Sequence, residues 1–300
     1  MQSYYFLADY HALVKNQDPE RMRQSTLEIA ATWLALGLDT ETAVFYRQSD
    51  VPEIPELTWI LTCSTAKGLM NRAHAYKAVV QDNVAAGEDP DYAITMGLFS
   101  YPVLMAADIL MFNSTHVPVG KDQIQHLEMA RDIAQRFNHH YGELFALPSA
   151  VTSEHVAVLP GKDGRKMSKS YNNTIPLWLP EKQLRKAIMR IVTNSLEPGE
   201  PKDPDDSALF AIYAAFAKRE QREEMRQAYR EGIAWGQAKQ ATFELINDEL
   251  GAARQRYQAL VAEPQRIEEV LQDGAVKARA FATPFLGRIR EAVGIRSLGR

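Results

Sequence analysis

The chain has 300 residues, 46% of them hydrophobic and 24% charged, the balance of a globular protein with one large or two smaller domains. The net charge of -4 gives no overall attraction to nucleic acid, so any RNA contact needs local basic patches. The single cysteine, Cys63, excludes a disulfide framework and a cysteine-ligated zinc site, and no apolar run reaches the ~18 residues of a membrane span, so a cytoplasmic protein is expected.

Strands and helices alternate in the first half of the chain. The run Tyr4–Leu7 is short, aromatic and apolar, which is typical of a buried strand. A helix is predicted from Pro19 to Gly37, because apolar residues recur there at helical spacing between a proline and a glycine. Residues 42–47 form the next predicted strand. Strands separated by helices indicate a parallel, doubly wound sheet.

The second half of the chain changes character after Pro180 and shows no convincing strand. Six segments have helical patterns: 181–194, 205–218, 220–248, 251–261, 265–272 and 275–293. We therefore predict an α/β domain over residues 1–175 and an all-α domain over residues 176–300.

A predicted helix over Tyr101–Leu110 carries one carboxylate among apolar residues. Tyr101, Met105 and Asp108 fall at i, i+4 and i+7 and share one face of this helix. A carboxylate in apolar surroundings needs a donor. Asp108 therefore either pairs with an internal N–H group or receives a proton donor from a ligand, with Met105 as an adaptable apolar wall for a flat ring.

Two further candidates follow predicted strands. Gly120–Gln123 lies where a strand ends and a long amphipathic helix begins, and His11 follows the first strand. Ligands bind at the carboxyl ends of strands in open α/β sheets, where helix N-termini attract anions. The plainer alternatives are a helix N-cap by Asp122 and a structural histidine.

The run Lys166-Met167-Ser168-Lys169-Ser170 lies in a predicted loop between glycines and prolines. A mobile loop with two ammonium groups can close on a polyphosphate and offset charge during phosphoryl or nucleotidyl transfer. The alternative is a solvated basic turn. We find no metal-binding or protein-nucleophile motif, so lysines and Mg²⁺-bound phosphates would carry the chemistry.

Four motifs together resemble the bacterial tryptophanyl-tRNA synthetases, which are class I aminoacyl-tRNA synthetases. They are Ala-Asp-Tyr-His-Ala (8–12), Tyr-Pro-Val-Leu-Met-Ala-Ala-Asp-Ile-Leu (101–110), Val-Pro-Val-Gly-Lys-Asp-Gln-Ile-Gln-His (117–126) and the loop 166–170. Their order and spacing agree with the family, and the resemblance extends from residue 4 to near residue 300. It implies a Rossmann-like domain followed by a helical, anticodon-binding domain.

The resemblance also implies an activity and a set of site residues. The activity is ATP-dependent formation of tryptophanyl-adenylate and transfer of tryptophan to tRNA(Trp), with Mg²⁺ accompanying ATP, in a cytoplasmic homodimer. Asp108 would accept the indole N–H, with Met105, Tyr101, His11 and Gln123 around the amino acid. The ATP site would comprise Gly120, Lys121, Asp122, Ala157, Val158, the loop Lys166, Met167, Ser168, Lys169 and Ser170, and Lys77. Of these, Lys166, Ser168 and Lys169 are the catalytic candidates.

Tryptophan is favoured over tyrosine by the chemistry of the two side chains. An indole N–H only donates, so one carboxylate suffices and the remaining wall should be apolar, whereas a phenol hydroxyl both donates and accepts. The related tyrosyl enzymes carry glutamine where this chain has Met105. Adenylation of another aromatic acid is a weaker alternative.

The family's first strand and its histidine–glycine signature have no counterpart in these residues. The resemblance then implies two unpaired sheet edges and an incomplete nucleotide cradle. Either the chain begins too late, or it is a shortened paralogue or fragment that binds tryptophan or nucleotide without catalysis. We expect little or no synthetase activity from the 300-residue polypeptide and full activity from an upstream-extended form.

Overall fold

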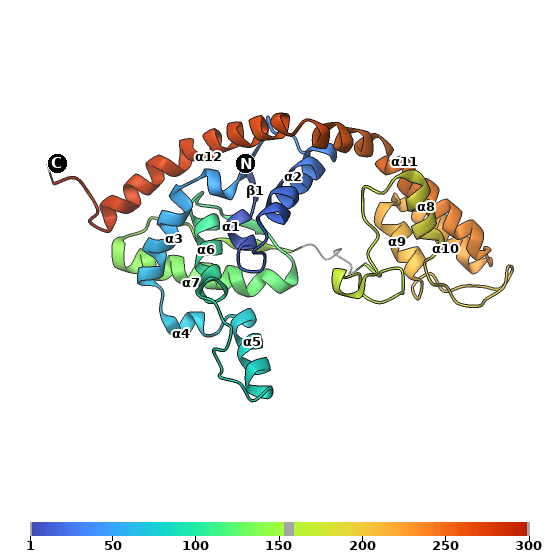
Figure 1. Ribbon diagram of the computed structural model, residues 1–300, viewed down its shortest axis with the longest axis horizontal. Coiled ribbons are helices and arrows are strands. Elements are labelled where there is room, and N and C mark those ends of the chain that lie inside the picture. The colour runs from blue at the N-terminus through green and yellow to red at the C-terminus, as the bar shows by residue number, and fades with distance from the viewer. Residues whose placement is uncertain (1, 153–158, 299–300) are drawn as a thin grey trace. The chain divides into compact units, whose positions relative to one another are not determined.

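A computed structural model describes residues 2–152 and 159–298 (Figure 1). The chain divides into two compact units, which we call unit 1 (residues 1–155 and 263–300) and unit 2 (residues 156–262). This division differs from the predicted boundary near residue 175. The lysine-rich loop groups with the helices that follow it, and the last long helix returns to the α/β part because it packs against a strand there.

Unit 1 contains two pairs of parallel strands. Strand β1 (Ser3–Leu7) pairs with β2 (Ala43–Arg47), and β3 (His116–Pro118) pairs with β4 (Ser149–Val151). Its helices are α1 (Asp9–Ala12), α2 (Pro19–Ala35), α3 (Glu53–Ser64), α4 (Lys67–Met70), α5 (His74–Ala85), α6 (Met96–Leu110), α7 (Ile124–Tyr141) and α12 (Pro264–Ala292), with 3₁₀ turns η1 (Gln48–Asp50) and η2 (Lys121–Gln123). The predicted parallel α/β class is confirmed.

The two strand pairs do not join into one sheet. Among the described residues, β1 pairs only with β2 and β3 only with β4, so each of these strands has one edge without a strand neighbour. Strand β2 is covered on both faces, because Val44, Phe45 and Tyr46 are all buried. Helices α3, α6, α7 and α12 supply most of the surrounding core.

Helix α6 begins earlier than predicted. Its N-cap is Thr95, whose hydroxyl accepts from the Leu98 N–H at 3.1 Å. Pro102 therefore lies inside the helix rather than in its first turn. A proline in the first turn is a common helix start, but here the capping threonine starts the helix and the residues before Tyr101 are helical as well. Helix α6 contacts both α3 and α7, and Figure 1 shows the three helices close together.

Unit 2 contains the turn η3 (Lys169–Tyr171) and helices α8 (Glu181–Met189), α9 (Ala208–Phe216), α10 (Arg219–Arg230) and α11 (Trp235–Ala262). The predicted helix over 220–248 is wrong, because the chain turns at Gly232, where φ is 86°. The predicted break before residue 251 is also wrong, since Gly251 lies inside α11. None of the helices in the described ranges combines the length and apolar character needed to cross a bilayer.

Helix α12 is continuous where two helices were predicted, and Gly274 explains why a glycine is needed there. A Cβ atom at Gly274 would lie 1.7 Å from the carbonyl oxygen of Phe45 on β2. The helix and the strand therefore touch through backbone atoms, which no other residue permits.

Replacing Gly274 with alanine is expected to lower the free energy of unfolding by about 1–3 kcal/mol, because the helix must move away from β2. The matched control is Gly287→Ala on the same helix, where a Cβ meets nothing within 4 Å. That change is expected to stabilise the helix by about 0.5–1 kcal/mol. Urea titration gives the free energy of unfolding of both variants. Equal stabilisation by the two alanines would contradict the backbone contact between Gly274 and Phe45.

Candidate active site

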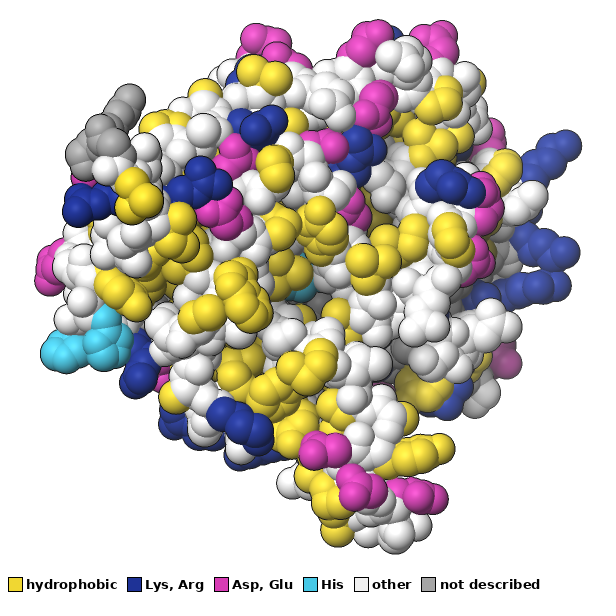
Figure 2. All heavy atoms as spheres, turned by 60° about the vertical axis from the view of Figure 1, so that its left-hand side comes forward, with side chains coloured by type: hydrophobic (Ala, Val, Ile, Leu, Met, Phe, Trp, Pro, Cys, Tyr) yellow, Lys and Arg dark blue, Asp and Glu magenta, His cyan; other side chains and the backbone are white. Residues whose placement is uncertain are grey.

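A cavity of about 470 Å³ lies beyond the carboxyl ends of β1 and β3. Its lining includes all five residues assigned above to the amino-acid site: His11 on α1, Tyr101, Met105 and Asp108 on α6, and Gln123 on η2. Phe6, Val14 and Leu98 add apolar surface. The predicted helical face and the predicted strand ends thus meet in one place. Figure 2 shows a face of the molecule on which hydrophobic side chains gather around a hollow.

Asp108 is the most buried polar group of this cavity, with 5% of its surface exposed. Its Oδ2 lies 2.8 Å from Nε2 of His11, and its Oδ1 accepts from Nε2 of Gln48 at 2.7 Å. Burial raises the pKa of the Asp108 carboxyl, and the hydrogen bonds from His11 and Gln48 oppose that rise. Internal pairing, one of the two alternatives, is therefore present. A carboxylate has about four acceptor positions, so these two bonds leave room for one more donor.

A second chain of hydrogen bonds orients the opposite side of the cavity. The Tyr101 hydroxyl lies 2.6 Å from Nε2 of His126, and Nδ1 of His126 lies 3.0 Å from Oε1 of Gln123. Nε2 of Gln123 then donates to Oδ2 of Asp122 at 2.9 Å. Burial lowers the pKa of His126, which favours the neutral form of the ring. This chain fixes the rotamers of Tyr101 and Gln123.

Two residues of these networks were not predicted. Gln48 is fully buried, and its Oε1 also accepts from the Tyr10 N–H at 3.2 Å. It directly follows strand β2, so a polar residue at a strand end could have identified it. His126 belongs to the motif at residues 117–126, which does not by itself predict a role for it. It follows the start of the helix by two residues, and its inward direction could not be read from spacing.

The cavity can bind a flat apolar ring that carries one donor group. Met105, Phe6 and Leu98 offer apolar surface, while Asp108 offers a buried acceptor. A ligand without a donor would leave that carboxylate with an unused position in an apolar wall.

The residues predicted to bind ATP lie in several parts of the fold. Gly120, Lys121 and Asp122 lie between β3 and α7 as predicted, but they are not among the residues that line this cavity. Lys77 is exposed on α5 and also lies outside the lining. Ala157 and Val158 lie outside the described residues.

The loop Lys166–Ser170 belongs to unit 2. Both lysine side chains are exposed, and Lys169 starts the turn η3. The buried Asn173, which is 2% exposed, holds the backbone of the loop through hydrogen bonds. Its Oδ1 accepts from the Ser168 N–H at 2.8 Å, and its Nδ2 donates to the Lys166 carbonyl at 3.1 Å. The backbone of the loop is thus held while its ammonium groups remain in solvent.

Replacing Asn173 with alanine is expected to cost about 1–3 kcal/mol in local stability, because two backbone groups of the loop lose their bond to it and the Asp163 carboxylate loses one of its donors. Hydrogen exchange of residues 159–172 should accelerate. The neighbouring change Asn172→Gly serves as the control, since Asn172 is exposed and has a φ of 50°, which glycine adopts easily. Equal acceleration in both variants would contradict the role given to Asn173.

Comparisons with known proteins agree with this geometry. The family model described as tRNA synthetases class I (W and Y) matches residues 1–251. A tryptophan–tRNA ligase of Pseudomonas aeruginosa is 67% identical over 99% of this chain and 67% of its own length. One from Neisseria meningitidis is 59% identical over 99% of this chain and 89% of its own length.

A solved structure shows the same similarity. Tryptophanyl-tRNA synthetase from Campylobacter jejuni, complexed with ADP and tryptophan, matches with a TM-score of 0.85 and 46% identity over 96% of this chain and 88% of that chain. With the parallel strands, the buried Asp108 carboxylate and the lysine loop, these matches show that the chain belongs to the class I tRNA synthetases of the tryptophan and tyrosine family.

Proposed function

We propose that the chain is a tryptophan–tRNA ligase, which joins L-tryptophan to ATP as tryptophanyl-adenylate and transfers it to tRNA(Trp). The observation that carries the proposal is the unit 1 cavity, where one buried carboxylate, Asp108, faces apolar side chains that include Met105. This arrangement suits an indole, which only donates. A phenol hydroxyl would need a second polar partner beside the carboxylate.

The proposed chemistry is adenylation by positioning and charge stabilisation. The carboxylate of tryptophan attacks the α-phosphorus of ATP, and pyrophosphate leaves with the negative charge. The exposed ammonium groups of Lys166 and Lys169 would stabilise that charge, and the Ser168 hydroxyl would add a hydrogen bond. Mg²⁺ is a hard cation that binds phosphate oxygens, so it would enter with ATP. Gly120, Lys121 and Asp122 would hold the nucleoside.

The proposed partners are tRNA(Trp) and a second copy of the chain. Arg185 and Lys186 on helix α8 and Arg190 at its C-cap are exposed, and such a basic surface suits tRNA phosphates. In unit 1, Trp59 on α3 is 68% exposed, and Cys63 one turn later is also exposed. An exposed tryptophan suits a homodimer interface. A cytoplasmic location follows from this function.

The test is ATP–pyrophosphate exchange with L-tryptophan or L-tyrosine, followed by charging of tRNA(Trp). We expect that whatever exchange the 300-residue polypeptide supports requires tryptophan and does not occur with tyrosine. Exchange driven equally by tyrosine would contradict the proposal. Tryptophan binding without exchange or charging, in this form and in longer forms, would favour the non-catalytic binder.

A further inference from the structure

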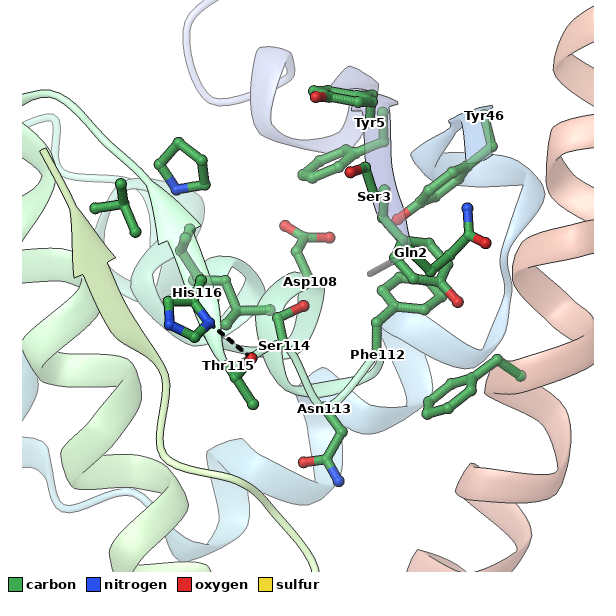
Figure 3. A pocket seen from close by; sticks show the side chains of 17 residues that line it. Gln2, Ser3, Tyr5, Tyr46, Asp108, Phe112, Asn113, Ser114, Thr115 and His116 are labelled. Carbon is green, nitrogen blue, oxygen red and sulfur yellow. Dashed lines mark hydrogen bonds between the residues drawn. The ribbon is translucent and has the colours of Figure 1, made fainter. Parts of the chain in front are cut away.

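The amino-acid cavity of unit 1 has two polar ends. One end is the Asp108 carboxylate, which Figure 3 shows between the labelled side chains of β1 and His116 of β3. At the other end, Tyr101 and His126 both line the cavity, and the Tyr101 hydroxyl lies 2.6 Å from Nε2 of His126. The proposed contact with an indole N–H involves the first end alone, so the chemistry of the second end decides what else a ligand must carry.

The direction of the hydrogen bonds at the second end is set by Asp122. An ionised carboxylate only accepts, so the atom of the Gln123 side chain that lies 2.9 Å from Oδ2 of Asp122 must be the amide nitrogen. The amide oxygen of Gln123 therefore faces Nδ1 of His126 at 3.0 Å. Because an amide oxygen also only accepts, Nδ1 must carry a hydrogen and donate it, since two lone pairs would otherwise face each other.

A neutral imidazole carries only one ring hydrogen, so Nε2 of His126 is left as an acceptor. The neutral form is favoured because His126 is 8% exposed. Its pKa is lowered by burial and by His74 and His11, which together outweigh the opposite effect of Asp122. The Tyr101 hydroxyl must therefore donate to Nε2. Burial raises the pKa of Tyr101, so this hydroxyl keeps the hydrogen that it donates.

The hydroxyl of Tyr101 then offers a ligand only lone pairs. Its one hydrogen is directed to His126, while Oη keeps the capacity to accept on the side that lines the cavity. A ligand group that only donates fits this position. An ammonium group has three donors and no acceptor, and its charge strengthens each hydrogen bond. A carbonyl or carboxylate oxygen in the same place would meet lone pairs and be repelled.

We infer that His126 is a positioning residue of the amino-acid site, which as a neutral ring protonated at Nδ1 holds the Tyr101 hydroxyl as an acceptor for the ammonium group of the ligand. The inference rests on the proposed function in taking an amino acid as that ligand. Asp108 recognises the ring, and the Tyr101–His126 pair recognises the amine. Because Asp108 is held by His11 and Gln48, a change at His126 leaves recognition of the ring in place.

The protonation of the His126 ring is measured by nitrogen NMR of the unmodified chain labelled with ¹⁵N-histidine. We expect Nδ1 to carry the hydrogen and Nε2 to be unprotonated. The signals of His126 are identified by their absence in His126→Phe. If that variant does not fold, they are identified by their displacement in Tyr101→Phe, which removes the donor to Nε2. A neutral ring protonated at Nε2 would overturn the inference, whatever the ligand or the activity of the chain.

Ligand binding separates positioning from a general loss of structure. The probes are L-tryptophan and indole-3-propionate, which is the same molecule without the amine, and binding is measured by calorimetric titration. We expect His126→Phe and Tyr101→Phe each to weaken tryptophan binding about tenfold and to change indole-3-propionate binding by less than about twofold. The double variant should bind tryptophan as each single variant does, because the two residues act as one unit.

His139 provides the matched control for His126. It is an exposed histidine on the same helix, α7, and lies outside the lining of the cavity, so His139→Phe should bind both probes as the unmodified chain does. Equal weakening of both probes by His126→Phe, or additive losses in the double variant, would overturn the inference. If the unmodified chain bound neither probe, the proposed function would fail, and the protonation of the His126 ring would still decide the direction of the hydrogen bonds.

Discussion

Replacing Asp108 with alanine is expected to weaken binding of L-tryptophan roughly 100-fold, which corresponds to ~3 kcal/mol for a hydrogen bond to a buried charged acceptor. The same change should destabilise unit 1, because His11 and Gln48 lose their shared acceptor. Asp108→Asn keeps one acceptor oxygen, so its effect on binding should be intermediate. Calorimetric titration and thermal unfolding measure the two effects separately.

The matched control for Asp108 is Glu53, a second buried carboxylate of unit 1. Glu53 is 6% exposed and accepts from Arg279 at 3.1 Å and Thr283 at 2.6 Å, but it does not line the amino-acid cavity. Glu53→Gln should therefore lower stability while leaving the tryptophan Kd unchanged. If Glu53→Gln weakened tryptophan binding as much as Asp108→Asn, the loss of binding at Asp108 would come from a general loss of structure and not from a lost contact with the indole.

Alanine at Lys166 or Lys169 is expected to lower kcat for ATP–pyrophosphate exchange by about 10²-fold each, because each would remove a cation from the developing pyrophosphate charge. The tryptophan Kd should not change, since the proposed contact is with phosphate. Fold stability should also be unaffected, because both side chains are exposed. Exchange must be measured in a form of the protein that supports it, under saturating ATP and tryptophan.

Lys182 provides the comparison for the two loop lysines. It is exposed on α8 in the same unit, so Lys182→Ala removes the same charge outside the loop. We expect exchange by this variant to match that of the unmodified chain. A similar loss of kcat in all three alanine variants would indicate a general charge effect and contradict the specific role of the loop.

The residues of the site that could be predicted are those whose position follows from a local sequence pattern, such as helical spacing or the end of a strand. Helical spacing placed Tyr101, Met105 and Asp108 on one face, and all three line one cavity. His11 and Gln123 each follow a predicted strand, and because ligands bind at the carboxyl ends of parallel strands they were expected beside the other three; both line the same cavity. Their position around one cavity could be predicted because a helical period and a strand end each fix a direction without reference to distant residues, and their roles in binding stay predictions.

The missed features depend on contacts between distant segments. Gln48 and Asp108 are far apart in the chain, so their bond could not be read from either local pattern. Two helices were predicted on either side of Gly274, because a glycine normally weakens a helix. There it instead permits contact with Phe45 on β2, a neighbour supplied by the tertiary fold. Asn173 likewise reads as a loop residue and proves to be the buried support of its loop.

The central claim is that one buried carboxylate in an apolar cavity selects an indole. Calorimetric titration of the unmodified chain with L-tryptophan and with L-tyrosine tests it most directly. We predict that tryptophan binds at one site per chain and at least about tenfold more tightly than tyrosine, because only the indole satisfies Asp108 without needing a second polar partner. Equal affinity for the two amino acids, or tighter binding of tyrosine, would contradict the account.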